Sequence, residues 1–301
     1  MKSLTLIITF SLYTALVNAQ CLQGNCTSGT GTYRYSTGSV YTGQFKNMRE
    51  HGTGEMIWNN GDTYSGEWNN GTMHGRGTYT WASGNYYKGL WENGLKNGYG
   101  EYYWVNGDVY IGNYKNDLFD GKGTYRWANG DYYSGDYKDG KKHGRGVYSF
   151  KDGGGYDGEW MNDMYHGRGR LIFKNGDIYE GDFKNNVRTG NGIMKYADGG
   201  IYSGSWLNNL CHGYGERNWE NGDVYKGDWQ SNQRTGTGTY IWATGTVYQG
   251  NWKENKRVGQ GVQTWADGTR YEGEWNNDEM SGLGTCEWIS GDKYTGEWLR
   301  G

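Results

Sequence analysis

The sequence predicts an all-β protein in which 23-residue hairpins stack into an elongated, single-layer antiparallel β-sheet. A segment that begins with tyrosine recurs every 23 residues from Tyr41 to Tyr271 without an insertion, and a fixed period of this length is typical of repeat architectures. Aromatic residues and glycines recur at every second position within a copy, which is the spacing of one face of a strand. The 301 residues include no proline, which suits strands whose N–H groups all donate to neighbouring strands.

Residues 1–19 have the features of a secretory signal peptide. Lys2 precedes an apolar stretch from Leu4 to Val17, and the small residue Ala19 comes just before Gln20. The alternative is an uncleaved membrane anchor, but the stretch is shorter than the roughly 20 apolar residues that a membrane span needs. We therefore expect a protein that is secreted or resides in the lumen of the secretory pathway, rather than one anchored by its N-terminal segment.

Residues 20–40 are expected to form a leader followed by half a repeat. Cys21 and Cys26 lie close enough in the sequence to form a disulfide, which suits an oxidising compartment. Cys211 and Cys286 are not expected to pair with each other, because they lie at different repeat positions three copies apart.

Two N-x-S/T motifs are candidate glycosylation sites. The motif at Asn25 lies in the leader. The motif at Asn70 lies in a predicted turn, which would leave the asparagine accessible.

Residues 41–293 comprise eleven complete copies of the repeat, and residues 294–301 begin a twelfth. When each copy is numbered from its first tyrosine as position 0, glycine occupies positions 2, 11, 13 and 20 in every complete copy. All 16 tryptophans occupy position 4 or position 17. The copy that starts at Tyr64 shows the pattern through Tyr64, Gly66, Trp68, His74, Gly75, Gly77, Trp81 and Gly84.

Each copy is expected to form one hairpin with a packing face and a polar face. Positions 0, 2 and 4 share one face of the first strand, and positions 11, 13, 15 and 17 share one face of the second. The glycines at positions 2, 11 and 13 are expected to lie beneath aromatic rings, and the glycine at position 20 to supply a positive φ in the turn between copies. The polar face has carboxylates at position 3, such as Glu159, which are expected to face water.

No pattern in the sequence indicates an enzyme, a cofactor or a metal site. All five histidines occupy position 10, where other copies have Asn, Asp, Thr, Val or Ser, and this range of residue types indicates a structural role. The carboxylates at position 3 form a row along one face rather than a facing acid–base pair. The formal net charge of −3 gives no indication of a nucleic-acid partner. The histidines are His51, His74, His143, His166 and His212.

The repeat resembles the membrane occupation and recognition nexus (MORN) repeat, whose core is YxGxWxxGxxHGxG. Tyr64, Gly66, Trp68, Gly71, His74, Gly75 and Gly77 nearly spell out this core. The resemblance covers about residues 29–301 and implies an elongated single-layer sheet with one hairpin per repeat. It also implies a scaffold, a dimerising rod or a membrane-associated module.

Two functional hypotheses follow. The first is a non-enzymatic scaffold of the secretory pathway or cell exterior, which mediates protein association or self-assembly. The alternative is a module that binds phospholipid head groups or glycans and so associates with a membrane surface.

Self-association is predicted at the strand from Lys293 to Trp298. This strand has no proline, and no later segment is expected to cover it, so its unpaired N–H and C=O groups would be exposed. Tyr294 and Trp298 are expected on its packing face. We therefore predict a homodimer that forms end to end through the last two copies.

Overall fold

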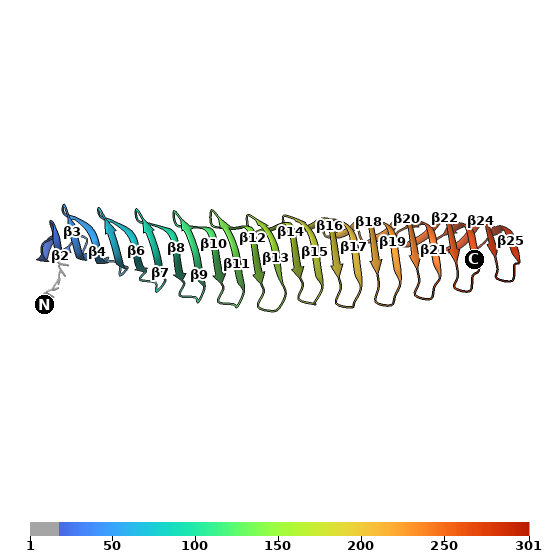
Figure 1. Ribbon diagram of the computed structural model, residues 1–301, viewed down its shortest axis with the longest axis horizontal. Coiled ribbons are helices and arrows are strands. Elements are labelled where there is room, and N and C mark those ends of the chain that lie inside the picture. Colours follow the sequence, from blue (N-terminus) through green and yellow to red (C-terminus); the bar gives the residue numbers. More distant parts are fainter. Residues whose placement is uncertain (1–17, 301) are drawn as a thin grey trace, which may run out of the picture. The chain divides into compact units, whose positions relative to one another are not determined.

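The computed structural model describes residues 18–300 (Figure 1). Within this range every regular element is a β-strand, and the 25 strands are assigned to one antiparallel sheet. The predicted fold class is therefore confirmed. The described residues include no helix that is long and apolar enough to cross a membrane. The predicted signal peptide falls largely on residues 1–17, which lie outside the described residues.

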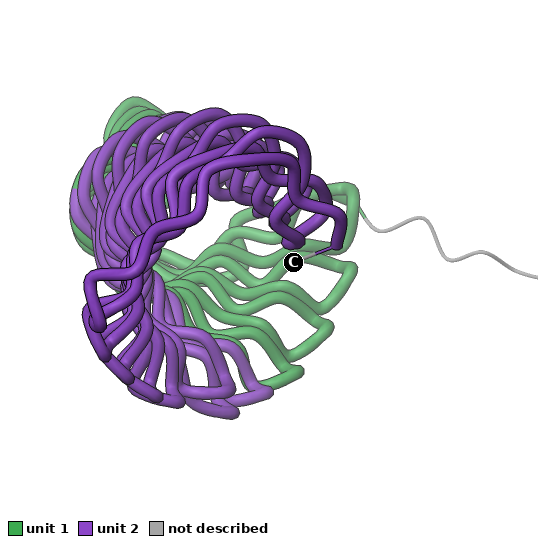
Figure 2. Tube along the Cα trace, turned by 90° about the vertical axis from the view of Figure 1, so that its right-hand side faces the viewer, with its two compact units in different colours: residues 1–121 green, residues 122–301 purple. Residues whose placement is uncertain are grey.

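The chain divides into two compact units, residues 1–121 and residues 122–301 (Figure 2). The strands of the first unit are β1 (Gln20–Gly24), β2 (Gly29–Arg34), β3 (Val40–Lys46), β4 (Arg49–Ile57), β5 (Thr63–Asn69), β6 (Thr72–Thr80), β7 (Tyr86–Glu92), β8 (Leu95–Tyr103) and β9 (Val109–Lys115). The unit boundary falls within β10 (Leu118–Arg126).

The second unit contains the remaining strands, which are bent in Figure 2, so that the sheet of this unit is curved. They are β11 (Tyr132–Lys138), β12 (Lys141–Ser149), β13 (Gly155–Met161), β14 (Met164–Ile172), β15 (Ile178–Lys184), β16 (Val187–Lys195), β17 (Ile201–Leu207), β18 (Leu210–Asn218), β19 (Val224–Gln230), β20 (Gln233–Ile241), β21 (Val247–Lys253), β22 (Lys256–Thr264), β23 (Arg270–Asn276), β24 (Glu279–Glu287) and β25 (Lys293–Trp298).

Two kinds of turn join the strands. Within a copy, two residues at positions 6 and 7 link the strands, and both have a positive φ, as at Asn70 (49°) and Gly71 (84°). This is the geometry of a hairpin turn whose twist matches that of its strands. Between copies, the Trp58 N–H donates to the Asp62 carbonyl, and Gly61 has a φ of 90°. The positive φ expected of glycine at position 20 is therefore confirmed.

The tyrosine at position 0 is the centre of each copy. All eleven of these tyrosines are at most 1% exposed. The hydroxyl of Tyr64 donates to the Glu67 carbonyl over 2.9 Å, and a Cβ atom at Gly77 would lie 2.2 Å from the Tyr64 Oη. Gly66 is equally crowded by the Tyr64 Oη and by the Gly77 Cα. The tyrosine ring therefore lies across the glycines at positions 2 and 13, as expected.

The glycine at position 11 has a different role, so the expectation of a ring above it is wrong. The register shifts in this hairpin, because Gly66 pairs with Gly77 whereas Glu67 pairs with His74. Gly75 lies in the resulting bulge with a φ of 58°, a conformation that glycine adopts at low cost. A Cβ atom on Gly75 would meet the carboxylate of Glu67 at 2.4 Å.

The carboxylate at position 3 is bound to the bulge, which corrects the expectation that it simply faces water. Glu159 accepts the N–H of Arg168 over 3.2 Å, and Glu67 accepts the N–H of Arg76 over 2.8 Å. Asp136, Asp182 and Asp228 accept the corresponding N–H groups of their own copies. The carboxylate thus accepts a backbone N–H group that the shifted register leaves without a partner on the neighbouring strand.

The two tryptophan positions also differ. Trp68 and the other tryptophans at position 4 of the complete copies are buried, and the Trp68 Nε1–H donates to the carbonyl of Gly54 in the preceding copy over 3.2 Å. Trp81 and the other tryptophans at position 17 lie just after the second strand, in the connection between copies, where they are partly exposed. The strand thus ends one residue before position 17, but the ring still packs with the tyrosines at position 15, as Trp81 does with Tyr79 at 4.5 Å between ring centroids.

Candidate functional site

The leader contains the paired cysteines. The Sγ atoms of Cys21 and Cys26 are 2.08 Å apart and their Cα atoms 6.0 Å apart. This disulfide links β1 to the segment before β2, and β1 pairs with β2. Cys211 and Cys286 are free and buried, and burial raises the pKa of the Cys211 thiol to about 11.

Both candidate glycosylation sites are exposed. Asn25 Oδ1 accepts the N–H groups of Thr27 and Ser28, so the side chain is held in a local turn. Asn70 is the first residue of the two-residue hairpin turn. Glycosylation of Asn25 and of Asn70 remains a prediction.

The histidines are partly buried in the hairpins and do not form a hydrogen-bonding network. The Nδ1 atoms of His51, His74, His143 and His166 are buried without a hydrogen-bond partner in the described part of the chain. The backbone carbonyl of His74, in contrast, accepts the hydroxyl of Tyr64. Residues 18–300 include no group of three or more His, Cys, Asp or Glu residues that could hold a metal ion.

Adjacent copies are joined by polar contacts that sequence reasoning missed. The side chain at position 7 of one copy accepts the N–H at position 9 of the copy before, as Asp278 does from Arg257 over 2.9 Å. At the other end of the hairpin, Asp62 accepts the N–H of Ala82 and the hydroxyl of Tyr79 in the next copy. The recurrence of Asn or Asp at these two positions was the available signal, but the partners lie about one repeat away in the sequence.

The packing face is exposed at the outer edge of β25. Tyr294 is 45% exposed, whereas the equivalent tyrosines of the complete copies are buried. Tyr271, for example, is covered by Trp298, with ring centroids 5.2 Å apart. No described strand pairs with the outer edge of β25, and no described ring covers Tyr294 in this way. Leu299, which follows the last residue of β25, is 92% exposed.

The structure thus places Tyr294 and Trp298 together at an open edge. The Trp298 Nε1–H donates to the Gly284 carbonyl over 3.2 Å, so this side chain is already docked on the preceding copy. The ring of Tyr294 lies against Trp298 and across Gly296. The outer edge of β25 can therefore pair with a further strand, and an aromatic ring can pack on Tyr294.

A comparison with protein families matches the MORN repeat to eleven consecutive segments of the chain. The matched segments are 41–63, 64–86, 87–109, 110–132, 133–155, 156–178, 179–201, 202–224, 225–247, 248–270 and 271–293. A comparison with curated proteins finds no match.

Several solved structures share a distant likeness. The SAS-4 (dCPAP) TCP domain of Drosophila melanogaster, in complex with a proline-rich motif of Ana2 (dSTIL), is 15% identical, with 52% of this chain and 85% of that chain covered and a TM-score of 0.33. The wild-type TCP10 domain of Danio rerio CPAP is 10% identical, with 80% and 98% covered and a TM-score of 0.33. Virginiamycin B lyase from Staphylococcus aureus is 13% identical, with 94% and 98% covered and a TM-score of 0.15. Likenesses at these scores support no functional inference.

Proposed function

The chain belongs to the MORN repeat family, and we propose that it is a non-catalytic assembly module that binds a second copy of itself through the edge of β25. The observation that carries this proposal is the exposure of Tyr294, which is 45% where the equivalent tyrosines are at most 1%. An exposed strand edge with aromatic side chains is a template for pairing with another strand.

The glycine register supports one particular pairing. Glycine pairs with glycine in the last hairpins, since Gly273 pairs with Gly284 and Gly284 pairs with Gly296. An antiparallel pairing of two β25 strands centred on Gly296 would continue this rule. It would also set Tyr294 of one copy opposite Trp298 of the other, and such cross-strand aromatic pairs are favourable. The interface would have the two-fold symmetry of most homodimers.

The proposed location is the secretory pathway or the cell exterior. The sequence of residues 1–19 supports it through its order of charge, apolar stretch and small residue. The disulfide between Cys21 and Cys26 supports it as well, because disulfides persist in oxidising compartments.

The test is the light-scattering mass of residues 20–301 and of Tyr294→Lys. We expect the unchanged protein to have twice the mass of one chain and the variant to be a monomer, because lysine at an edge opposes strand addition. Leu22→Lys is the matched control, since Leu22 is similarly exposed at 43% but lies in β1. It should leave the dimer intact.

A monomeric unchanged protein at tens of micromolar, or a dimer that survives Tyr294→Lys, would contradict the proposal. A monomer that sediments with phospholipid vesicles or binds a glycan array would instead favour the alternative hypothesis, a module that associates with a membrane surface.

A further inference from the structure

Three arginines share one cavity in the copies that start at Tyr179, Tyr202 and Tyr225. The cavity has a volume of about 410 Å³, and its lining includes Arg188, Arg217 and Arg234. The rest of the lining consists of aromatic rings, three asparagines, Met194 and the buried Cys211, without a carboxylate. Three positive charges therefore face one space that has no negative side chain on its wall.

Arg188 and Arg234 hold their guanidinium groups against the buried tryptophan of the next copy. The Cζ atom of Arg188 lies 4.7 Å from the centroid of Trp206, and that of Arg234 lies 4.5 Å from the centroid of Trp252. Such contacts fix the plane of the guanidinium group. They do not neutralise its charge.

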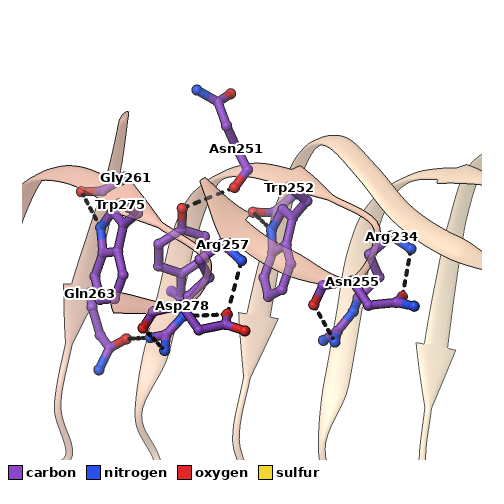
Figure 3. Close-up of polar contacts among 11 residues, drawn as sticks. Arg234, Asn251, Trp252, Asn255, Arg257, Gly261, Gln263, Trp275 and Asp278 are labelled. Carbon is purple, nitrogen blue, oxygen red and sulfur yellow. Dashed lines mark hydrogen bonds and ion pairs between the residues drawn. The ribbon is translucent and has the colours of Figure 1, made fainter. Parts of the chain in front are cut away.

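Other copies show how the chain neutralises a cation in this place. Lys96, Lys142 and Arg257 also occupy position 9, and each faces an aspartate at position 7 of the next copy. Arg257 Nε lies 3.1 Å from Asp278 Oδ1 (Figure 3). Arg234, in the same place one copy earlier, faces Asn255 instead (Figure 3).

Arg188 and Arg234 are the two cations at position 9 that face an amide. Arg188 faces Asn209, and its N–H groups bond to the side chain and the carbonyl of that residue. Arg234 bonds to the carbonyl of Asn255 over 2.9 Å. Within residues 18–300 neither guanidinium group forms an ion pair, and Asp278 and Asp177 act on Arg234 and Arg188, respectively, only at longer range.

Arg217 is the third cation of the cavity and occupies position 15, where Tyr79 and Tyr240 stand in other copies. Its Cζ atom lies 3.7 Å from the centroid of Tyr196. Its Nε atom is buried and has no hydrogen-bond partner in the described part of the chain. Gln263 holds position 15 of another copy and accepts a hydrogen bond from Arg257. The polar side chain of Gln263 therefore has a hydrogen-bond partner at this position, whereas the Nε atom of Arg217 has none.

The absence of a carboxylate in contact with either guanidinium group is unfavourable at this degree of burial. Burial lowers the pKa values of Arg188 and Arg234. A partly buried charge without an ion partner costs free energy, which a bound anion recovers. The guanidinium group of arginine can also donate two parallel hydrogen bonds to the oxygens of a carboxylate or phosphate group.

We propose that this cavity binds a small ligand in which an oxyanion is attached to a flat aromatic body. Arg217 and Arg234 would bind the oxyanion, and the rings of the wall, such as Tyr196 and Trp229, would pack against the flat body. The site lies within the second unit, and the proposal does not depend on association through β25.

The test is isothermal titration of the unchanged 20–301 protein with phenyl phosphate, benzoate, inorganic phosphate and the uncharged benzyl alcohol. We expect saturable binding of phenyl phosphate or benzoate with one site per chain. Inorganic phosphate should bind more weakly, because it cannot pack against the rings. Benzyl alcohol should not bind measurably.

Asn255→Asp is the decisive variant, because it gives Arg234 the carboxylate that Asp278 gives Arg257. Aspartate accepts the backbone N–H at this position elsewhere in the chain, so the fold should be kept. We expect affinity for the aromatic anion to fall by about tenfold or more, and Arg217→Met to have a similar effect.

Asn186→Asp is the matched control. Asn186 holds the same position and accepts the N–H of Tyr165, which is not a cation. It should leave the affinity unchanged. The proposal is overturned if no anionic probe binds saturably to the folded chain, if benzyl alcohol binds equally well, or if Asn255→Asp and Arg217→Met bind as tightly as the control.

Discussion

At the scale of single residues, the position-0 tyrosine explains most of the repeat. Tyr248 is fully buried, its ring meets those of Trp252 and Trp275 edge to face at 5.2 and 5.3 Å, and its hydroxyl donates to the Asn251 carbonyl. Each such ring pair contributes about 0.5–1.5 kcal/mol beyond the area that it buries. One side chain therefore holds its own hairpin together and fastens it to the next copy.

Because this ring lies so close to the backbone, a side chain in place of the glycine beneath it is expected to lower stability. Gly158→Val should lower the free energy of unfolding by about 1–3 kcal/mol or more, because an added Cβ atom would lie 2.6 Å from both the Tyr156 Oη and the Gly169 Cα. Asp157→Val is the control, since Asp157 is exposed on the opposite face of the same strand. Chemical denaturation measures both, and equal losses would show that the ring tolerates a side chain beneath it.

At the scale of the hairpin, the bulge decides where side chains point. The register shifts between Gly158 and Glu159, so that Gly158 pairs with Gly169 while Glu159 pairs with His166. Gly167 takes a positive φ of 55° within the bulge, and the Glu159 carboxylate covers the exposed amide of Arg168. The bulge therefore depends on two residues that lie on different strands.

The capping of the bulge can be tested at Glu159. Glu159→Leu should lower the free energy of unfolding by about 1 kcal/mol, since the Arg168 N–H loses its acceptor. Glu159→Gln should largely retain the stability, because Gln44 accepts the equivalent N–H of Thr53 in the first copy. If the leucine and glutamine variants unfold at the same denaturant concentration, the side-chain bond adds nothing to the hairpin.

At the scale of the whole molecule, each copy contacts mainly the copies beside it. The side chain at position 7 bonds to the preceding copy, as Asn186 does to Tyr165, and the rings at position 0 meet tryptophan or another aromatic ring of the next copy. Stability in such a chain is close to a sum over copies and their interfaces. An entire copy is therefore dispensable, provided that the period is kept.

Deletion of residues 155–177, which is one period, should leave a folded protein. Lys142 would then meet Asn186 in place of Asp163, and asparagine accepts the same backbone N–H. Deletion of residues 155–176 should unfold the junction, because a shift of one residue turns every side chain of the next strand to the wrong face. Near-ultraviolet circular dichroism distinguishes the two, and similar spectra for both deletions would contradict this account.

Local chemistry explains what could be predicted. The period, the burial of Tyr64 and Trp68 and the positive φ of Gly84 were foreseen, because they depend on side-chain type, alternation and turn conformation within one copy. The role of Gly75 was not, and neither was the end of the strand just before Trp81. Alternation assumes an unbroken strand, and the bulge at Gly75 breaks it at a point that depends on how two strands pair.

The sequence by itself determined that this is a β-sheet of 23-residue hairpins in the MORN repeat family, because the copies have tyrosine, glycine and other aromatic residues at the same positions. Only the tertiary structure decided that Asp278 forms an ion pair with Arg257 while Asn255 leaves Arg234 without one. The residues of each pair lie 21 apart in the chain, and they meet only because stacking brings position 7 of one copy beside position 9 of another. Which charges are paired is therefore a property of the stacked sheet rather than of any single repeat.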